Sequence, residues 1–323
     1  MQNRFLDISY LRVIAMLLVV FGHCICPYSL WNEPGYSAGF KVEIWETTIA
    51  CLNQIHLPIF FLIAGFLYGG NRFRGGYLDK VEFVWKKILR VIVPYVIVGT
   101  FMCFVQKRSA CEMMLGVSHL WFLMTIFECY VLGIIFDPLL FLSIKKKFCI
   151  MGLCCVVVVF TMHWSLHTRF LTMDKFLHYF PLYLIGMFVG TIDIRKYAGK
   201  RKFLIALMIP AMFVLPLQHY FFLSRTFDQI CGLCIVIPFF LLFRTTHFTK
   251  FPNWLGSLDR YSMGIYILHQ ILQQEMNKVQ PFYGLMVGYE YIYPLMQFVF
   301  LILFCWYFTW LAHHSKYAKF FLG

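Results

Sequence analysis

The chain is a succession of apolar runs, each long enough to cross the hydrocarbon core of a lipid bilayer. A spanning helix needs about 20 predominantly apolar residues, and a helix in lipid satisfies its backbone hydrogen bonds internally. Runs of this kind alternate with short polar connections along the whole sequence. The pattern predicts ten spans, at residues 8–26, 47–69, 83–106, 120–142, 148–165, 176–194, 203–223, 228–245, 259–276 and 289–312.

Composition indicates the same class of protein and excludes a soluble domain. Of the 323 residues, 61% are hydrophobic and only 13% are charged. We therefore expect an all-α fold, a polytopic transmembrane helical bundle that forms a single domain over residues 1–323. The net charge of +13 does not indicate nucleic-acid binding, because the basic residues lie in short loops between apolar runs.

The distribution of basic residues over the loops predicts the topology. Cytoplasmic loops of membrane proteins carry an excess of Lys and Arg. Every second connection is rich in these residues, and both ends of the chain follow the same alternation. Both termini are therefore expected in the cytoplasm. The basic residues on this side include Arg4, Arg72, Arg74, Lys80, Lys145, Lys146, Lys147, Arg195, Lys196, Arg244, Lys250, Lys316 and Lys319.

The first apolar run carries two ionisable side chains on one helical face. Arg12 and His23 are eleven residues apart, which leaves them about 20° out of line and about 16 Å apart along a helix axis. Ionisable residues inside a span are costly and usually mark a site or a pathway. The alternative is that Arg12 reaches to the interface and His23 is an ordinary residue at a helix end.

Histidines gather at the predicted outer ends of the spans. Histidine is the side chain whose unperturbed pKa suits proton transfer near neutrality. Several of them at one depth indicate a polar chamber, although loop histidines are more often solvated bystanders. We retain His23, His56, His119 and His269 as candidate functional residues.

A group of basic residues lies at the predicted cytoplasmic start of the third span. Lys87 and Arg90 share a helical face, and Lys86 lies one turn before Arg90. Arg72 precedes them in the sequence. Clustered donors of this kind suit phosphate groups. The alternative is that they anchor the protein to anionic lipid.

We consider three of the acidic residues that lie within or near the spans. Glu128 lies deep in the fourth span, so it should face the bundle interior and pair with Arg12 or a histidine. Asp7 and Asp137 lie nearer the interfaces and are expected to need no special partner.

The twelve cysteines indicate neither a disulfide framework nor a metal centre. Most lie inside apolar runs, where cysteine behaves as a small buried hydrophobe. Cys231 and Cys234 have the spacing of a redox or metal pair, but they lie within a span and no second pair accompanies them. We therefore expect no metal.

An ordered set of motifs resembles the acyltransferase-3 family of integral membrane acyltransferases. The set comprises Arg4-Phe-Leu-Asp7-Ile-Ser-Tyr-Leu-Arg12 followed by His23, His56-Leu-Pro58-Ile-Phe-Phe61-Leu-Ile-Ala64-Gly65, Phe83-Val-Trp-Lys-Lys-Ile-Leu-Arg90-Val-Ile-Val-Pro94-Tyr95, His119-Leu-Trp121-Phe-Leu123 and Ser262-Met-Gly264-Ile-Tyr266-Ile-Leu-His269. Two positions depart from the family pattern. Lys87 replaces a frequent arginine, which removes a bidentate donor. Ala64 replaces a frequent serine, so no hydroxyl at that position can be essential here.

The resemblance implies transfer of an acyl group, usually acetyl, from cytoplasmic acyl-CoA. The acceptor would be a hydroxyl of an envelope carbohydrate or a lipid-linked glycan, and the enzyme would be a multi-pass protein of the cell (inner or cytoplasmic) membrane, in contact with membrane lipid. His23 is expected to be the base that removes the hydroxyl proton. The other expected site residues are Arg12, His56 and Glu128 for catalysis, Lys86, Lys87, Arg90 and Arg72 for the donor phosphates, and His119, Trp121 and His269 for the acceptor.

Two other classes of function stay open at this point. A transporter or flippase for a glycan or lipid-linked substrate could use Arg12 and His23 as part of a substrate or proton pathway. Such a protein is expected to show repeat-related broken helices, and the sequence shows no such symmetry. A non-catalytic membrane scaffold has no need of intramembrane Arg, Glu and His side chains.

Overall fold

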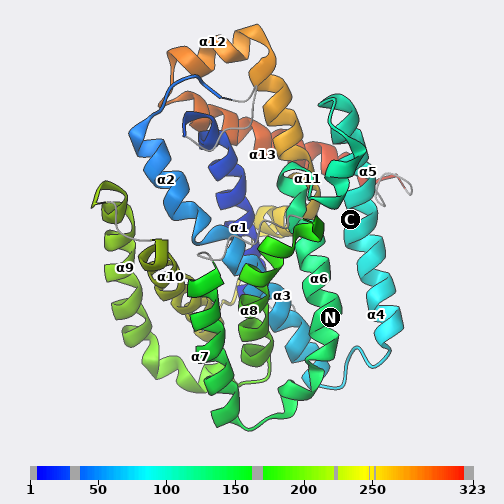
Figure 1. The fold of residues 1–323 in the computed structure, drawn as a ribbon, viewed down its shortest axis with the longest axis vertical. Coiled ribbons are helices and arrows are strands. Elements are labelled where there is room, and N and C mark those ends of the chain that lie inside the picture. The colour runs from blue at the N-terminus through cyan, green and yellow to red at the C-terminus, as the bar shows by residue number, and fades with distance from the viewer. Residues whose placement is uncertain are drawn as a thin grey trace.

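Two closely packed helices, α3 (His56–Phe73) and α8 (Met173–Gly190), form the centre of the computed structural model of this chain (Figure 1). The structure describes residues 6–29, 37–161, 170–221, 225–246, 248–250 and 252–315. Within these residues all regular structure is helical, as the sequence predicts. Arg4, Lys316 and Lys319, which the topology prediction uses, lie outside the described residues.

A helix falls on each of the ten predicted runs. The second run is divided between α2 and α3, and the third between α4, a π-helical segment η2 and α5. The short helix α12 (Gln280–Gly288) lies outside the predicted runs. The helices on the predicted runs other than α3 and α8 are α1 (Leu6–Ile25), α2 (Glu43–Asn53), α4 (Lys80–Lys87), η2 (Ile88–Ile92), α5 (Val93–Val105), α6 (Trp121–Ile135), α7 (Ile144–Thr161), α9 (Arg201–Phe221), α10 (Arg225–Thr245), α11 (Asn253–Lys278) and α13 (Tyr293–Ala312).

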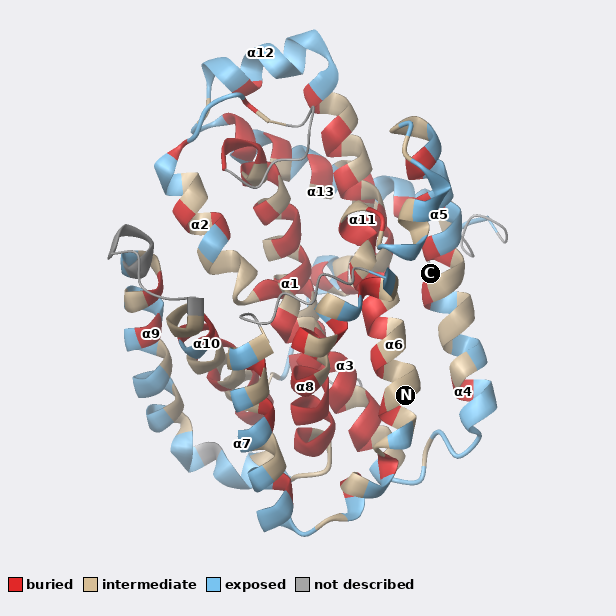
Figure 2. Cartoon of the chain, viewed as in Figure 1, coloured by how far each residue is buried: buried red, intermediate tan, exposed pale blue. Residues whose placement is uncertain are grey.

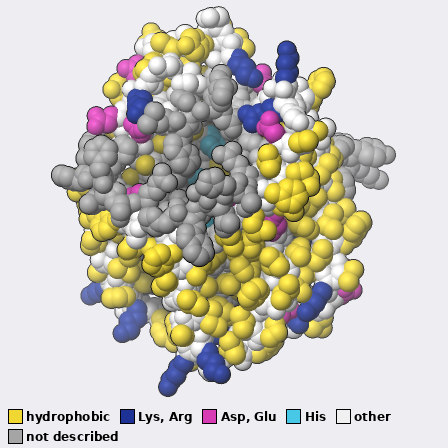
Figure 3. Space-filling model, viewed as in Figure 1, with side chains coloured by type: hydrophobic (Ala, Val, Ile, Leu, Met, Phe, Trp, Pro, Cys, Tyr) yellow, Lys and Arg dark blue, Asp and Glu magenta, His cyan; other side chains and the backbone are white. Residues whose placement is uncertain are grey.

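The chain is a helical membrane protein by the length and composition of these helices. Six segments of the described chain are long and apolar enough to cross a membrane: Leu6–Tyr28, Glu43–Phe73, Lys80–Val105, Ala110–Ile135, Thr226–Thr245 and Tyr293–Ala312. Figure 3 shows a broad area of hydrophobic side chains over the lower half of one face, with Lys and Arg side chains along its lower edge. Ten spans and two cytoplasmic termini stay predictions.

Glycines bring the backbones of α3 and α8 into direct contact. A Cβ atom built on Gly65 would lie 1.9 Å from the Tyr183 carbonyl oxygen, and one on Gly186 would lie 2.2 Å from that of Leu62. Gly190 meets the backbone of Gly70 in the same way, at 2.5 Å. Small residues at four-residue spacing let two helices approach closely in a membrane protein. Figure 2 accordingly shows α3 and α8 as the most continuously buried part of the bundle.

Two buried carboxylates tie helices together at the end of the bundle where α3 and α8 finish. Asp7 in α1 forms an ion pair with Arg244 in α10, and both residues are more than nine-tenths buried. Asp137 accepts hydrogen bonds from Tyr68 (2.7 Å) and Arg72 (2.8 Å). The expectation that Asp7 and Asp137 need no special partner is therefore wrong. Buried carboxylates require partners, and sequence position alone suggested more solvent than these two receive.

Candidate active site

Three histidine side chains from separate parts of the chain meet in the bundle interior. His23 lies in the last turn of α1, His119 in the short 3-10 helix η4 (Ser118–Leu120), and His269 in α11. The Nδ1 atom of His23 is 2.7 Å from Nε2 of His269, and their rings stack with centroids 4.9 Å apart. The His119 ring stands edge-on to both, at 6.1 and 5.2 Å. All three were candidate functional residues from the sequence, and the structure places their side chains in contact.

A backbone carbonyl determines which ring nitrogens carry protons in this cluster. Nδ1 of His269 lies 3.1 Å from the carbonyl oxygen of Ile265, which can only accept, so Nδ1 carries the hydrogen. Nε2 of neutral His269 then accepts a hydrogen bond from Nδ1 of His23. The lone pair of neutral His23 is therefore on Nε2. His23 is in the tautomer that can take a proton from a substrate at Nε2.

His119 is held by α11 at two points. Its Nε2 donates to the carbonyl oxygens of Tyr266 (3.1 Å) and Ile267 (3.2 Å). In return, the Tyr266 hydroxyl donates to the His119 carbonyl oxygen at 2.5 Å. Nδ1 of His119 is thus an acceptor, and it is buried without a hydrogen-bond partner among the described residues. Within that part of the chain, no three His, Cys, Asp or Glu side chains are arranged to hold a metal ion.

A network of buried amide side chains lies beside His23 and contacts it through Gln273. Gln273 in α11 donates to the carbonyl oxygen of His23. Gln297 in α13 donates to Asn277 Oδ1 at 2.7 Å, and the Tyr293 hydroxyl donates to the same oxygen at 2.8 Å. Sequence reasoning missed this network. Its signal is the helical spacing of amides in an otherwise apolar segment, at Gln270, Gln273, Gln274 and Asn277.

Arg12 pairs with a different acid from the one expected. Its Nη1 lies 3.2 Å from Asp259 Oδ1 in α11, and Ser9 donates to Asp259 Oδ2 at 2.8 Å. The expected pairing with Glu128 is therefore wrong. The reason is tertiary: α1 packs beside α11, whereas Glu128 lies on α6 and receives a 3.4 Å hydrogen bond from Thr172. About 16 Å of α1 separates Arg12 from His23.

His56 lies close to the histidine cluster without joining it by a described hydrogen bond. It is buried at the start of α3, and its Nδ1 donates to the Leu52 carbonyl oxygen. It lies within electrostatic range of His23. Trp121, by contrast, stacks on Tyr179 of α8, with ring centroids 5.7 Å apart. Trp121 therefore contacts the central helix pair rather than the histidines.

The four basic residues predicted to bind phosphate each have a different contact or exposure. Arg72 pairs with Asp137 at 2.8 Å, and Lys86 pairs with Glu82 at 2.6 Å. Lys87 lies over the Tyr130 ring, with Nζ 3.9 Å from the centroid. Arg90, in η2, is exposed. Two of the four cations thus already face a carboxylate.

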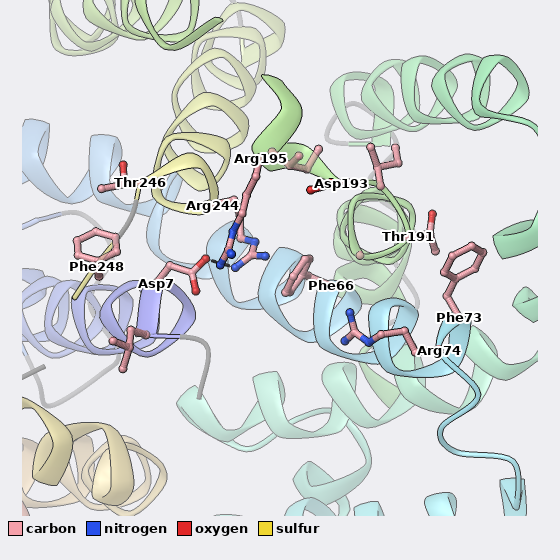
Figure 4. Close-up of a pocket in the computed structure, with 14 residues that line it drawn as sticks. Asp7, Phe66, Phe73, Arg74, Thr191, Asp193, Arg195, Arg244, Thr246 and Phe248 are labelled. Carbon is pink, nitrogen blue, oxygen red and sulfur yellow. Dashed lines mark hydrogen bonds and ion pairs between the residues drawn. The ribbon is translucent and has the colours of Figure 1, made fainter. Parts of the chain in front are cut away.

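A pocket that the sequence analysis did not predict lies at the end of the bundle where α3 and α8 finish (Figure 4). Its volume is about 610 Å³. The charged residues that line it are Arg74, Arg195, Arg244, Asp7 and Asp193. These residues lie in four connections or helix ends far apart in the sequence, so only the tertiary structure reveals that they converge.

Comparison with known proteins gives one match. A family model described as an acyltransferase domain matches residues 5–314, nearly the whole chain. No curated protein and no solved structure matches the chain.

Proposed function

Because the chain belongs to the acyltransferase-3 family of membrane acyltransferases, we propose that it is an O-acyltransferase that uses cytoplasmic acyl-CoA as the donor. The transferred group is acetyl, and the acceptor is a hydroxyl of an envelope or surface carbohydrate. The observation that carries this proposal is the 2.7 Å contact between His23 and His269. It provides a polarised base in a buried, amide-lined site.

His23 is the proposed base. As the acceptor oxygen attacks the thioester carbonyl, Nε2 of His23 takes the hydroxyl proton, which contributes about 10²–10⁴ in rate. The imidazolium that forms is stabilised because Nδ1–H of His23 donates to Nε2 of His269. When the tetrahedral intermediate collapses, the C–S bond breaks and the proton passes to the departing CoA sulfur. The products are the ester and free CoA.

The other proposed site residues act around this base. His269 is a positioning residue, because it is held by the Ile265 carbonyl and in turn orients the His23 ring. His119 presents an acceptor nitrogen beside both rings, which suits a hydroxyl of the acceptor. Arg12 positions α1 against α11 through Asp259. His56 and Glu128 are proposed to assist the base, and Trp121, which stacks on Tyr179, is proposed to bind the acceptor.

The donor is proposed to enter from the opposite end of α1. The first turn of α1 and His23 are about 24 Å apart along the helix, so the acylated arm of the donor must extend into the bundle. Lys87 and Arg90, with Lys86 and Arg72, are one candidate set for its phosphates. No resident cofactor or metal takes part in the proposed reaction.

The proposal is tested with purified protein and with cells. Purified protein in nanodiscs should bind acetyl-CoA saturably and hydrolyse it slowly when no acceptor is present. Cells that lack the gene should lose O-acetyl groups from their surface glycans, and the intact gene should restore them. Unchanged surface glycans together with no acetyl-CoA binding would refute the proposed function.

A further inference from the structure

The arginine-lined pocket combines positive charge with apolar walls. Arg74 follows α3, Arg195 lies in the 3-10 helix η7 (Ile194–Lys200), and Arg244 lies near the end of α10. Figure 4 shows these side chains around the cavity, with the ring of Phe66 between Arg244 and Arg74. The guanidinium carbon of Arg244 lies 4.2 Å from the centroid of that ring. Phe73 and Phe248 also line the cavity.

Contacts between helices hold the backbone around this pocket in place. Gly190 and Gly70 bring the ends of α8 and α3 into backbone contact beside it. On the opposite side, the ion pair between Asp7 and Arg244 joins the first turn of α1 to α10. That turn adds the positive end of a helix dipole to the cavity.

The balance of charges leaves the pocket positive. Among the described residues, three arginines line it against two aspartates. Both carboxylates already face a cation, since Asp7 pairs with Arg244, and Asp193 lies 3.9 Å from Nζ of Lys196. A ligand that fits here therefore carries negative charge. Planar guanidinium groups match phosphate oxygens in pairs, which favours phosphate over a single carboxylate.

We infer that this pocket binds a phosphate-bearing ligand through Arg74 and Arg195. Arg244, held by its ion pair with Asp7, forms part of the pocket wall. The volume of about 610 Å³ lies within the range of about 300–1,000 Å³ for small-molecule sites, so it holds more than one phosphate ion. The phenylalanine rings offer apolar surface to a base or an acyl chain. Two sources share this chemistry: the nucleotide end of CoA, which rests on the proposed function, and the headgroup of an anionic phospholipid.

The test replaces Arg74 and Arg195, which are both exposed, so the variants should fold like the wild type. The full-length protein and its Arg74→Gln and Arg195→Gln variants are prepared in nanodiscs of phosphatidylcholine. Binding of CoA, adenosine 3′,5′-bisphosphate and pantetheine is measured by calorimetry at low ionic strength. If the nucleotide is the source, each variant binds CoA and the bisphosphate about ten-fold more weakly, because each loses a charge-assisted contact. Pantetheine, which has no phosphate, binds equally to all three proteins.

A second arm tests the lipid source. The same proteins are melted in nanodiscs with and without phosphatidylglycerol. If a lipid headgroup is the source, the anionic lipid raises the melting temperature of the wild type and raises it less in each variant. Lys146→Gln is the matched control in both arms, because Lys146 is an exposed cation at the same end that does not line the pocket.

The outcomes separate this inference from the proposed function. It is overturned if neither the nucleotide nor the anionic lipid distinguishes the two variants from wild type and Lys146→Gln. If Arg90→Gln weakens CoA binding and the two pocket variants do not, the donor binds at the predicted basic set and the nucleotide source is excluded; the inference is then overturned unless the anionic lipid distinguishes the pocket variants. Phosphate binding that depends on Arg74 and Arg195, in a protein without acyl transfer, would support the inference and count against the proposed function alone.

Discussion

The base assigned to this site depends on one backbone carbonyl, that of Ile265. Because the carbonyl accepts from Nδ1 of His269, the hydrogen bond at 2.7 Å must run from His23 to His269 and not the reverse. Without His269, nothing in this chain of hydrogen bonds would keep the proton of neutral His23 on Nδ1. In the proposed reaction His269 therefore controls the base through its hydrogen bond to His23.

Replacing His269 tests this positioning role. We expect His269→Phe, which keeps an aromatic ring of similar size, to lower kcat by about 10²-fold, within the range for general-base catalysis. The KM for acyl-CoA should stay within about two-fold, because the donor phosphates bind elsewhere. Steady-state kinetics at several pH values make the measurement. A variant that raises KM and leaves kcat unchanged would show that His269 binds substrate instead.

The partner of Arg12 gives a prediction about stability. Arg12 is 34% exposed and Asp259 only 3%, so Arg12→Ala removes a cation from beside a buried carboxylate and should cost about 1–3 kcal/mol. Adding Asp259→Asn should recover most of that loss, because it removes the buried negative charge. Thermal melts in detergent measure both effects.

The control for this prediction is the acid that the sequence favoured. Adding Glu128→Gln to Arg12→Ala should recover nothing, since Glu128 bonds to Thr172. Recovery by Glu128→Gln and not by Asp259→Asn would contradict the pairing seen in the structure. From sequence, Arg12 clearly needed a partner, but the choice between two acids in different helices depends on which helices are neighbours.

At the scale of the helices, the contact of α3 with α8 sets the geometry of both ends of the bundle. Its signal is present in the sequence as glycines at four-residue spacing, Gly65 with Gly69 and Gly186 with Gly190. The spacing suggests close packing but does not identify the partner helix. Breaks within a helix are easier to predict from the sequence than the partner of a helix. The third run changes to a π-helical segment just before Pro94, whose nitrogen has no hydrogen to donate.

A side chain at the α3–α8 contact should separate the helices. Gly186→Ala places a Cβ atom 2.2 Å from the Leu62 carbonyl oxygen, on backbone that cannot rotate away. Overpacking of this kind costs about 1–3 kcal/mol or more, so we expect a clear fall in melting temperature. Gly152→Ala in α7 is the matched control, because its Cβ meets nothing within 4 Å. Equal melting temperatures for both variants would contradict the packing described.

At the scale of the whole molecule, the sequence predicts the class and the order of helices but not the sites between them. Apolar periodicity and length are local properties, and the helices follow them closely from α1 to α13. The arginine pocket and the amide network beside His23 assemble from residues more than 240 positions apart. Single side chains such as His119 and His269 were therefore selected from sequence, whereas their mutual contacts were not.

The orientation of the whole molecule in the membrane follows from its loops. Basic loops alternate along the chain, so a reporter fused after Gly323 should lie in the cytoplasm. A fluorescent protein that matures only in the cytoplasm should be bright in this fusion, and a phosphatase that works only outside should be inactive. The reverse result would invert the two ends of the bundle and separate the arginine pocket from any cytoplasmic donor.

The proposed reaction depends above all on His23 as the catalytic base. The decisive measurement is acyl transfer by His23→Asn, or acetyl-CoA hydrolysis if no acceptor is supplied, beside its thermal melt in detergent. Asparagine keeps a hydrogen-bond donor and similar size, so we expect the wild-type melting temperature and a loss of about 10²–10⁴ in kcat. A folded His23→Asn protein that retains most of its activity would contradict the account, and would make His23 a structural residue.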